Sequence, residues 1–263
     1  MPLSRLKSLF RSKTTVDDTS RFCATLAPDT PFYAIGDIHG QADQLEKLLD
    51  QIDQDRASEG FEKATLLFIG DYIDRGAKSA EVLNRLYTLS QTVSTRTVCL
   101  MGNHEKMLLD FIDDPAGRGA MWLRFGGIQT LASFGITGAR EKAPAEDLLE
   151  ICDAFEAALP PKMLSWLKAL PLSWHSGNCS GAHAALNPAR APDGQSERTL
   201  LWGHADFMRK PRDDGQWVVH GHTIVKKPAI KDGRIAIDTG AYRSGPLTAA
   251  VISKGSCRFL QAR

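Results

Sequence analysis

Three short segments of the sequence combine glycines with side chains that bind metal ions. They read GDIHG at residues 36–40, GDYIDRG at residues 70–76 and GNHE at residues 102–105. Carboxylate, imidazole and amide ligands together favour Mn, Fe or Zn over Ca. Asp37 and His39 lie two residues apart and could chelate one ion, but a single such pair arises often by chance. Three such segments in order indicate a metal site.

Two further histidine segments lie in the C-terminal half of the chain, HAALNP at residues 183–188 and HGHT at residues 220–223. A lone buried histidine is more often a core residue than a ligand. Here small residues leave room beside the imidazoles, namely Gly181, Ala182, Ala184 and Gly221. A carboxylate that bridges two ions about 3.5–4 Å apart is a standard two-metal arrangement.

The first three segments each follow an apolar run typical of a buried strand, at residues 31–37, 64–71 and 96–103. A helical pattern follows each of them. Three strand-loop-helix units predict right-handed crossovers and a parallel sheet. Because such sheets place their sites at the carboxyl ends of the strands, the three loops should converge.

The remainder of the chain divides into a helical and a strand-rich part. Helices are expected at 120–125, 128–134, 147–158 and 161–170, and strands at 179–186, 216–221, 234–239 and 246–253. The pattern predicts a two-layered α/β sandwich in a single domain at 22–263, with a cap-like helical insertion at about 111–170. Residues 1–21 are expected to form a flexible basic tail.

Composition excludes several classes of protein. The 263 residues are 43% hydrophobic and 24% charged with a net charge of +1, which disfavours disorder and nucleic-acid binding. The five cysteines are scattered, so a reducing, cytoplasmic compartment is expected. No apolar run reaches the ~18 residues of a membrane span, and we expect no stable membrane insertion. The five tryptophans are expected to pack in the core or cap. The oligomeric state stays open.

The five motifs, in this order, resemble those of the calcineurin-like metallophosphoesterases. The resemblance covers about residues 32–248 and is greatest for the branch with PPP-type Ser/Thr protein phosphatases and symmetrical diadenosine tetraphosphatases. It implies a four-layer α/β/β/α sandwich of two mixed β-sheets flanked by helices, with a mainly helical cap insertion. It also implies two divalent metal ions, with Mn²⁺ expected first and Fe or Zn as alternatives.

The resemblance also implies a set of metal ligands. Asp37, His39 and His222 would hold the first ion, and Asp71 would bridge both. Asn103 and His183 match ligands of the second ion. His220 is expected to be a neighbour of the site. Asp238 is expected to accept a hydrogen bond from the N–H of a ligand imidazole, on the side that does not face the metal.

The implied reaction is attack on phosphorus by a hydroxide that bridges both ions. His104 would protonate the leaving oxygen as general acid, and Asp74 would orient its imidazole. Arg75 would contact the phosphoryl oxygens together with Asn103. Glu105 is expected to support the loops without touching substrate.

One position departs from the family pattern. Compact relatives carry an arginine after a Leu-Leu-Trp stretch, whereas this chain places His204 there, after Leu200-Leu201-Trp202-Gly203. Imidazole is only partly charged at neutral pH and lacks the guanidinium fork. We expect His204 to contact the phosphoryl group or the leaving group. The alternative is that it packs against Trp202 while Arg209 or Arg243 moves in.

The expected function is hydrolysis of phosphomonoesters by a dimetal phosphoesterase acting on a phosphorylated partner, either a phosphoprotein or a nucleotide. A Ser/Thr-type protein phosphatase is the first expectation. The alternative is a dinucleoside polyphosphate hydrolase acting on diadenosine tetraphosphate. A metal-binding scaffold that retains the fold is the non-enzyme alternative, and the complete ligand set argues against it.

Overall fold

The computed structural model describes residues 22–92 and 96–263, so the expected basic tail at 1–21 lies outside the described residues. The strands are β1 (Phe32–Ile35), β2 (Thr65–Phe68), β3 (Thr97–Cys99), β4 (Ser173–Ser176), β5 (Cys179–Ala182), β6 (Trp217–His220), β7 (Ala229–Lys231), β8 (Arg234–Ala236), β9 (Leu247–Ser253) and β10 (Ser256–Ala262). The helices are α1 (Ala42–Glu59), α2 (Ser79–Gln91), α3 (Asn103–Asp113), α4 (Pro115–Trp122), α5 (Ile128–Ser133), α6 (Ala145–Ala158), α7 (Pro161–Lys168) and α8 (Glu197–Trp202), with a π-helical turn at Leu123–Gly127 and a 3₁₀ turn at Pro192–Gly194.

The strands form two mixed sheets. The first has the order β10-β9-β1-β2-β3, in which β1, β2 and β3 are parallel and β9 and β10 are antiparallel to their neighbours. The second has the order β4-β5-β6-β8-β7, with β5, β6 and β8 parallel. The parallel strands expected from the first three units therefore form one side of the first sheet, with β3 at its edge.

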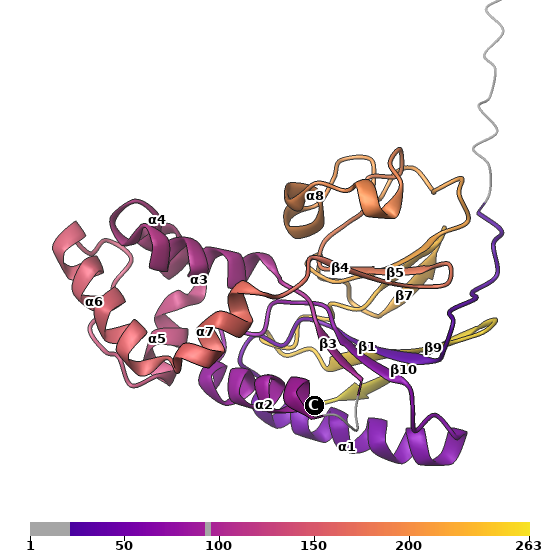
Figure 1. Cartoon of the computed structure of the whole chain (residues 1–263), viewed down its shortest axis with the longest axis horizontal. Coiled ribbons are helices and arrows are strands. Elements are labelled where there is room, and N and C mark those ends of the chain that lie inside the picture. The colour runs from indigo at the N-terminus through magenta and orange to yellow at the C-terminus, as the bar shows by residue number, and fades with distance from the viewer. Residues whose placement is uncertain (1–21, 93–95) are drawn as a thin grey trace, which may run out of the picture.

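Alternating side chains of the first sheet build two cores. Tyr33 and Ile35 of β1 pack in the core with α1 and α2. Phe32 and Ala34 face the other way, into a core shared with the second sheet. Helix α8 packs on the far face of that sheet through Leu200. The four-layer α/β/β/α sandwich implied by the family resemblance is confirmed, and it replaces the two layers expected from the pattern. Its fourth layer is a single short helix with loops (Figure 1).

Helices α3 to α7 lie together at one end of the sandwich, between β3 and β4 in the chain (Figure 1). The group consists of α3, which is the helix expected after the third strand, and of helices in the segment where the insertion at about 111–170 was expected. Trp122 is fully buried and stacks on Phe111, with ring centroids 4.8 Å apart. Gly126, with φ 118°, separates α4 from α5, which explains the break between the two helical patterns expected there.

Several elements differ from the expected ones, and strand β7 (Ala229–Lys231) is one that was not expected. The strand expected at 179–186 ends at Ala182, and the rest of that segment is a loop beside the site. Strand β10 was not expected, because its residues are mostly half-buried and form no continuous apolar run. Helix α8 was missed as well. None of the helices in the described ranges is long and apolar enough to span a membrane.

Candidate metal centre and active site

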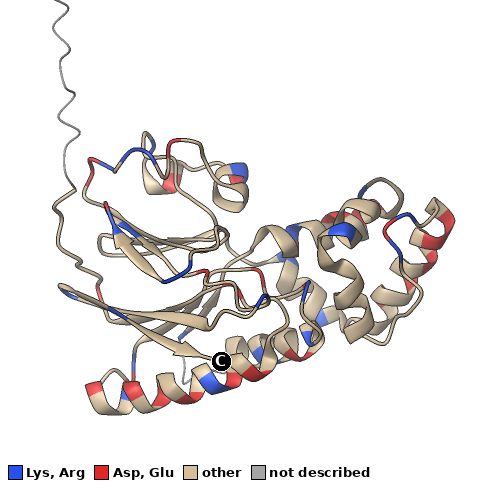
Figure 2. Cartoon of the chain, turned by 180° about the vertical axis from the view of Figure 1, so that it is seen from behind, with Lys and Arg blue, Asp and Glu red and all other residues tan. Residues whose placement is uncertain are grey.

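Backbone hydrogen bonds join the loops after β1 and β2, and the loop after β3 packs against the second loop. The N–H groups of Ile38 and His39 donate to the carbonyl of Asp71 at 3.0 and 2.9 Å. Gly70 lies directly against the third loop, because an added Cβ would be 2.6 Å from Gly102 Cα. The convergence expected from the sequence is therefore built into the main chain. In Figure 2, charged residues of both signs meet where these loops gather, between the sheets and the helical group.

Many site residues have a left-handed backbone. Seven non-glycine residues in the described ranges have positive φ, and five of them belong to the motifs: His39 (47°), Asp71 (57°), Asp74 (71°), Arg75 (68°) and His222 (60°). Such conformations cost energy for residues with a Cβ and persist where surrounding structure fixes them. Here they turn the side chains toward one point.

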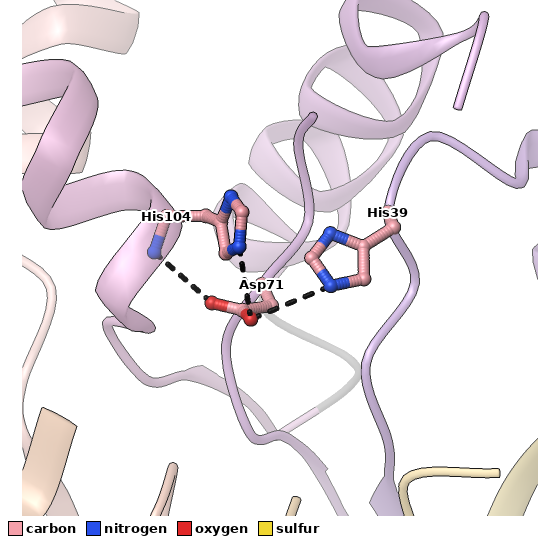
Figure 3. Close-up of side chains that lie close together, drawn as sticks. All are labelled: His39, Asp71 and His104. Carbon is pink, nitrogen blue, oxygen red and sulfur yellow. Dashed lines mark hydrogen bonds and ion pairs between the residues drawn. The ribbon is translucent and has the colours of Figure 1, made fainter. Parts of the chain in front are cut away.

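His39, Asp71 and His104 form the first group that could hold a metal ion, with one ligand atom of each lying within 4.8 Å of the others (Figure 3). The Nε2 atom of His39 lies 3.5 Å from Asp71 Oδ2, and the Nε2 atom of His104 lies 3.9 Å from it. The backbone N–H of His104, in the first turn of α3, donates to Asp71 Oδ1 at 3.1 Å.

Asp71, His183 and His222 form the second group. The Oδ1 atom of Asn103 lies 2.8 Å from His183 Nε2 and 2.9 Å from His222 Nδ1. Asp71 is common to both groups, as expected of a bridging carboxylate. The imidazole of His222, however, lies with Asn103 and His183, whereas we expected it beside Asp37 and His39. Only the backbone N–H of His222 reaches Asp37, at 3.0 Å.

The donor atoms of these groups fit divalent cations. The Nδ1 atom of His39 donates to the carbonyl of Ile73 at 2.8 Å, so its Nε2 lone pair faces Asp71 Oδ2. In the same way, Nδ1 of His183 donates to the carbonyl of Ile69 at 3.0 Å, and its Nε2 faces Asp71 Oδ1 at 3.3 Å. Acceptors that face acceptors in a buried site need a cation between them.

The protonation states agree with this fit. Burial lowers the pKa of His39 to about 3 and that of His183 to about 4, so both imidazoles are neutral near pH 7. Burial alone would raise the pKa of Asp71, but the surrounding imidazoles, His183 foremost, outweigh it and hold that pKa well below its usual range. Neutral imidazoles and an ionised carboxylate are the forms that bind metals.

Asp37 is buried beside the two groups without belonging to either. Gly221 makes room for it, because a Cβ there would lie 2.0 Å from Asp37 Oδ1. Burial, Asp238 and Asp71 together raise the pKa of Asp37 well above its usual value. Buried carboxylates that repel one another in this way are stabilised by a bound cation.

Of the two supporting residues expected around the site, Asp238 differs from the expectation. Among the described residues, Asp238 does not hydrogen-bond a ligand imidazole, since its Oδ1 accepts from the N–H of Gly240 at 2.9 Å. Backbone carbonyls already accept hydrogen bonds from the Nδ1–H groups of His39 and His183. His220 is buried, and its ring packs edge-on against Phe207 at 4.9 Å. It lies outside both metal groups, as expected of a neighbour.

Glu105 ties the second loop to the third. Its carboxylate accepts from the N–H groups of Asp71 and Tyr72, both at 2.8 Å, and from that of Gly102 at 2.9 Å. These contacts match the supporting role expected for it. Burial, followed by Asp71, raises the pKa of Glu105 to about 7.

His104 is held by a buried carboxylate. Its Nδ1 lies 2.6 Å from Asp74 Oδ2, and its Nε2 is buried without a hydrogen-bond partner in the described part of the chain. Asp74 also accepts from Trp122 Nε1 at 3.0 Å and from Thr130 Oγ1 at 2.6 Å. Burial alone would lower the pKa of His104, but Asp71 and Asp74 outweigh it and raise that pKa.

Arg75 lies at the first metal group. Its Nη1 is 3.2 Å from His39 Nε2, and its Cζ is 4.6 Å from the ring centroid of Tyr242. The Tyr242 ring also meets the His39 ring edge-on at 5.0 Å. A guanidinium placed on an aromatic face beside a metal group can contact the oxygens of a phosphoryl group.

Comparison with known proteins decides the family. Residues 30–226 match the calcineurin-like phosphoesterases. The chain belongs to that family. It is a dimetal phosphoesterase, and the resemblance inferred from the motifs is confirmed.

Relatives of this phosphoesterase include enzymes that act on dinucleotides. The chain is 29% identical to an asymmetrical bis(5'-nucleosyl)-tetraphosphatase of Bacillus velezensis, over 81% of this chain and 86% of that protein. It is 30% identical to a symmetrical bis(5'-nucleosyl)-tetraphosphatase of Methylococcus capsulatus, over 60% of this chain and 44% of that protein. A solved structure described as a candidate diadenosine tetraphosphatase shares the fold, with a TM-score of 0.61, 20% identity and coverage of 92% of this chain and 99% of that one.

Sequence reasoning missed three residues of this calcineurin-like site. Trp122 and Thr130 come from the helical group and fix Asp74, although Trp122 was expected only to pack. Tyr242 follows the Asp238 stretch by a few residues, and only the fold brings it to Arg75. Side chains that reach the site from distant segments leave no short-range spacing signal.

His204 lies in a pocket next to the second metal group. The pocket, of about 350 Å³, is also lined by Trp202, Met208 and His222. Trp202 is 42% exposed, and its ring lies 6.5 Å from that of His222. The Nδ1 atom of His204 accepts from the N–H of Asp206 at 3.2 Å, so a neutral ring carries its proton on Nε2. Contact of His204 with substrate stays a prediction.

Proposed function

We propose that this phosphoesterase hydrolyses dinucleoside polyphosphates such as diadenosine tetraphosphate. The observation that carries the proposal is the double cluster that shares Asp71, in which His104 is paired with Asp74 and Arg75 lies beside His39. The relatives' activities support this substrate class over a protein phosphatase, which was our first expectation. The scaffold alternative is disfavoured by the enzymes among the relatives.

Six residues would hold the two ions, for which Mn²⁺ is proposed: Asp37, His39, Asp71, Asn103, His183 and His222. Bound ions would neutralise charge on the phosphoryl group and make an ionised water available as the nucleophile near neutral pH. The carbonyls of Ile73 and Ile69 fix the imidazoles of His39 and His183, so their Nε2 lone pairs are preorganised.

His104 would donate the proton that the leaving oxygen needs. Its Nδ1–H is committed to Asp74, which leaves Nε2 to face the site, and the raised pKa keeps a larger share of the ring protonated. The carboxylate of Asp74 is fixed, because Thr130 donates to its Oδ1 and Trp122 donates to its Oδ2. A fixed imidazole–carboxylate pair is well suited to general acid catalysis.

Arg75 and Asn103 would bind the reacting phosphoryl group. Arg75 supplies a fork of N–H donors, and its position on Tyr242 reduces the rotamer entropy lost on binding. We further propose that the pocket of Trp202 and His204 accepts part of the leaving group, since it shares His222 with the second metal group.

Product analysis on three substrates tests the function. Purified enzyme is incubated with Mn²⁺ and diadenosine tetraphosphate, a phosphoserine peptide or p-nitrophenyl phosphate, with EDTA as the matched control. We expect the dinucleotide to have the highest kcat/KM, and EDTA to abolish all three activities. A higher kcat/KM for the phosphopeptide would reject the proposed substrate class and favour the alternative hypothesis, a protein phosphatase.

A further inference from the structure

Tyr242 lies between two arginines. The Cζ atom of Arg75 is 4.6 Å from its ring centroid, and that of Arg243 is 5.4 Å away. The Nε–H of Arg243 also donates to the Tyr242 hydroxyl at 2.9 Å. Arginine stacks readily on aromatic faces, and a hydrogen bond at the ring's polar end fixes the guanidinium further.

The Arg243 side chain lies near the reaction site, and part of its guanidinium is free to bind a ligand. Its guanidinium and that of Arg75 both act on the buried carboxyl of Asp238, opposing the rise in pKa that burial imposes. Within residues 22–92 and 96–263, Arg243 forms no ion pair with a carboxylate. Its side chain is exposed, so the remaining N–H donors of its fork are available to a ligand.

We propose that Tyr242 positions Arg243 as a second phosphate-binding arginine, which contacts the phosphoryl group adjoining the one that reacts. This inference rests on the proposed function and assigns a residue that would bind the polyphosphate chain of such a substrate. A phosphomonoester has one phosphoryl group, which Arg75 and the metal groups contact. A polyphosphate chain extends past the reacting phosphorus and reaches the second guanidinium.

The position of the pair supports this reading. Tyr242 packs against His39 of the first metal group, whereas Trp202 and His204 lie beside His222 of the second. The site therefore has a basic side and a side with an exposed aromatic ring. A dinucleotide polyphosphate carries both an anionic chain and flat bases, and can use the two sides together.

Binding of two small anions tests the role of Arg243. Calorimetric titrations at fixed Mn²⁺ compare inorganic phosphate with methylenediphosphonate, which has two phosphoryl groups and a bond that the enzyme cannot hydrolyse. The readout is the ratio of their affinities in each variant, because metal chelation by the diphosphonate is common to all variants. Arg243→Gln should reduce the wild-type preference for the diphosphonate roughly tenfold, as expected for loss of a charge-assisted contact.

Three further variants separate positioning from folding. Tyr242→Phe keeps the ring and loses the hydroxyl, so it should reduce the preference by a smaller factor than Tyr242→Leu, which removes the platform. Arg118→Gln changes an exposed arginine on α4 and should leave the preference at the wild-type value. An unchanged preference in Arg243→Gln, with metal content preserved, would overturn the inference.

The kinetics distinguish this inference from the proposed function. If the enzyme hydrolyses diadenosine tetraphosphate, Arg243→Gln should raise KM for it at least fivefold more than for p-nitrophenyl phosphate, with kcat less affected. If the wild type does not hydrolyse the dinucleotide, the proposed function fails, and the diphosphonate preference still decides the role of Arg243. Equal KM changes for both substrates would contradict the inference.

Discussion

Asp71 meets two structural demands at once. Its carboxylate faces both histidine groups, and its backbone has φ 57°, a conformation that residues with a Cβ seldom adopt. Glu105 accepts its N–H, and the first loop donates two N–H groups to its carbonyl. The main chain of this one residue is thus fixed from both neighbouring loops, which preorganises the shared ligand.

The His104→Asn variant should show whether His104 acts as the general acid or as a metal ligand. Because Nε2 of His104 would serve the leaving oxygen, we expect kcat for an alkyl phosphate to fall by about 10²–10⁴ with metal content retained. The loss should be smaller for p-nitrophenyl phosphate, whose leaving group needs no proton. Steady-state kinetics on both substrates and metal analysis measure this. Equal losses on the two substrates would show that His104 is not the acid.

At the scale of elements, the helical group of α3 to α7 helps to position a residue of the active site. Asp74 comes from the loop after β2, but its carboxylate is held by Trp122 of α4 and Thr130 of α5. The backbone N–H of Asp74 also donates to Thr130 Oγ1 at 2.9 Å. Helices that lie at one end of the molecule therefore fix the orientation of His104.

Thr130→Val should impair catalysis without removing metal. The buried Asp74 carboxylate would lose its 2.6 Å donor and gain freedom to rotate away from His104. We expect kcat to fall about 10- to 100-fold, the usual cost of losing an outer supporting contact. The loss should again be larger for alkyl than for nitrophenyl esters. Thr88→Val, at an exposed position on α2, is the matched control. Loss of metal in Thr130→Val would contradict the assignment.

Asp55 joins α1 to the first sheet and gives a pH-dependent stability. Its carboxylate pairs with both terminal nitrogens of Arg258 at 2.7 and 2.8 Å and accepts from the Tyr33 hydroxyl at 2.6 Å. The hydrogen bond from Arg258 is the first cause of its lowered pKa. Since the folded pKa is below the unfolded one, the stabilisation is present above about pH 4 and is lost as the pH falls through the folded pKa.

Asp55→Asn should therefore lower the free energy of unfolding by about 1 kcal/mol at pH 7. This value is smaller than for a buried pair, because Arg258 is half-exposed and solvent screens its charge. The difference from wild type should stay constant down to pH 5 and narrow below pH 4. Urea unfolding at pH 7, 5 and 3 measures it. Asp50→Asn, an exposed position on the same helix, should show no difference at any pH. A difference that is equal at pH 7 and pH 3 would refute this account of Asp55.

At the scale of the whole molecule, the sequence predicted what depends on local pattern. Apolar strands that end in glycine and a ligand residue identified β1, β2 and β3, and the ordered motifs identified both sheets through the family. The division of the candidate ligands between the two groups differs from the expected one. The imidazole of His222 lies beside Asn103, and only its backbone N–H reaches Asp37. This arrangement depends on how the second sheet packs against the first, and no spacing along the chain encodes that packing.

The residues that sequence reasoning missed share one property. Trp122, Thr130 and Tyr242 act on the site through a side chain whose partner lies in another segment of the chain. Strand β10 was missed for a related reason, since only pairing with β9 gives its half-exposed residues a strand environment.

Metal content of Asp71→Asn tests the central claim most directly, because both groups share this carboxylate. Wild type and Asp71→Asn are dialysed against Mn²⁺ and analysed by mass spectrometry of the metal, with Asp50→Asn as control. We predict two ions per chain in wild type and in the control, and at most one in Asp71→Asn, with hydrolysis of diadenosine tetraphosphate below about a tenth of wild type. Two retained ions together with more than that activity would contradict the claim that Asp71 bridges the metal centre.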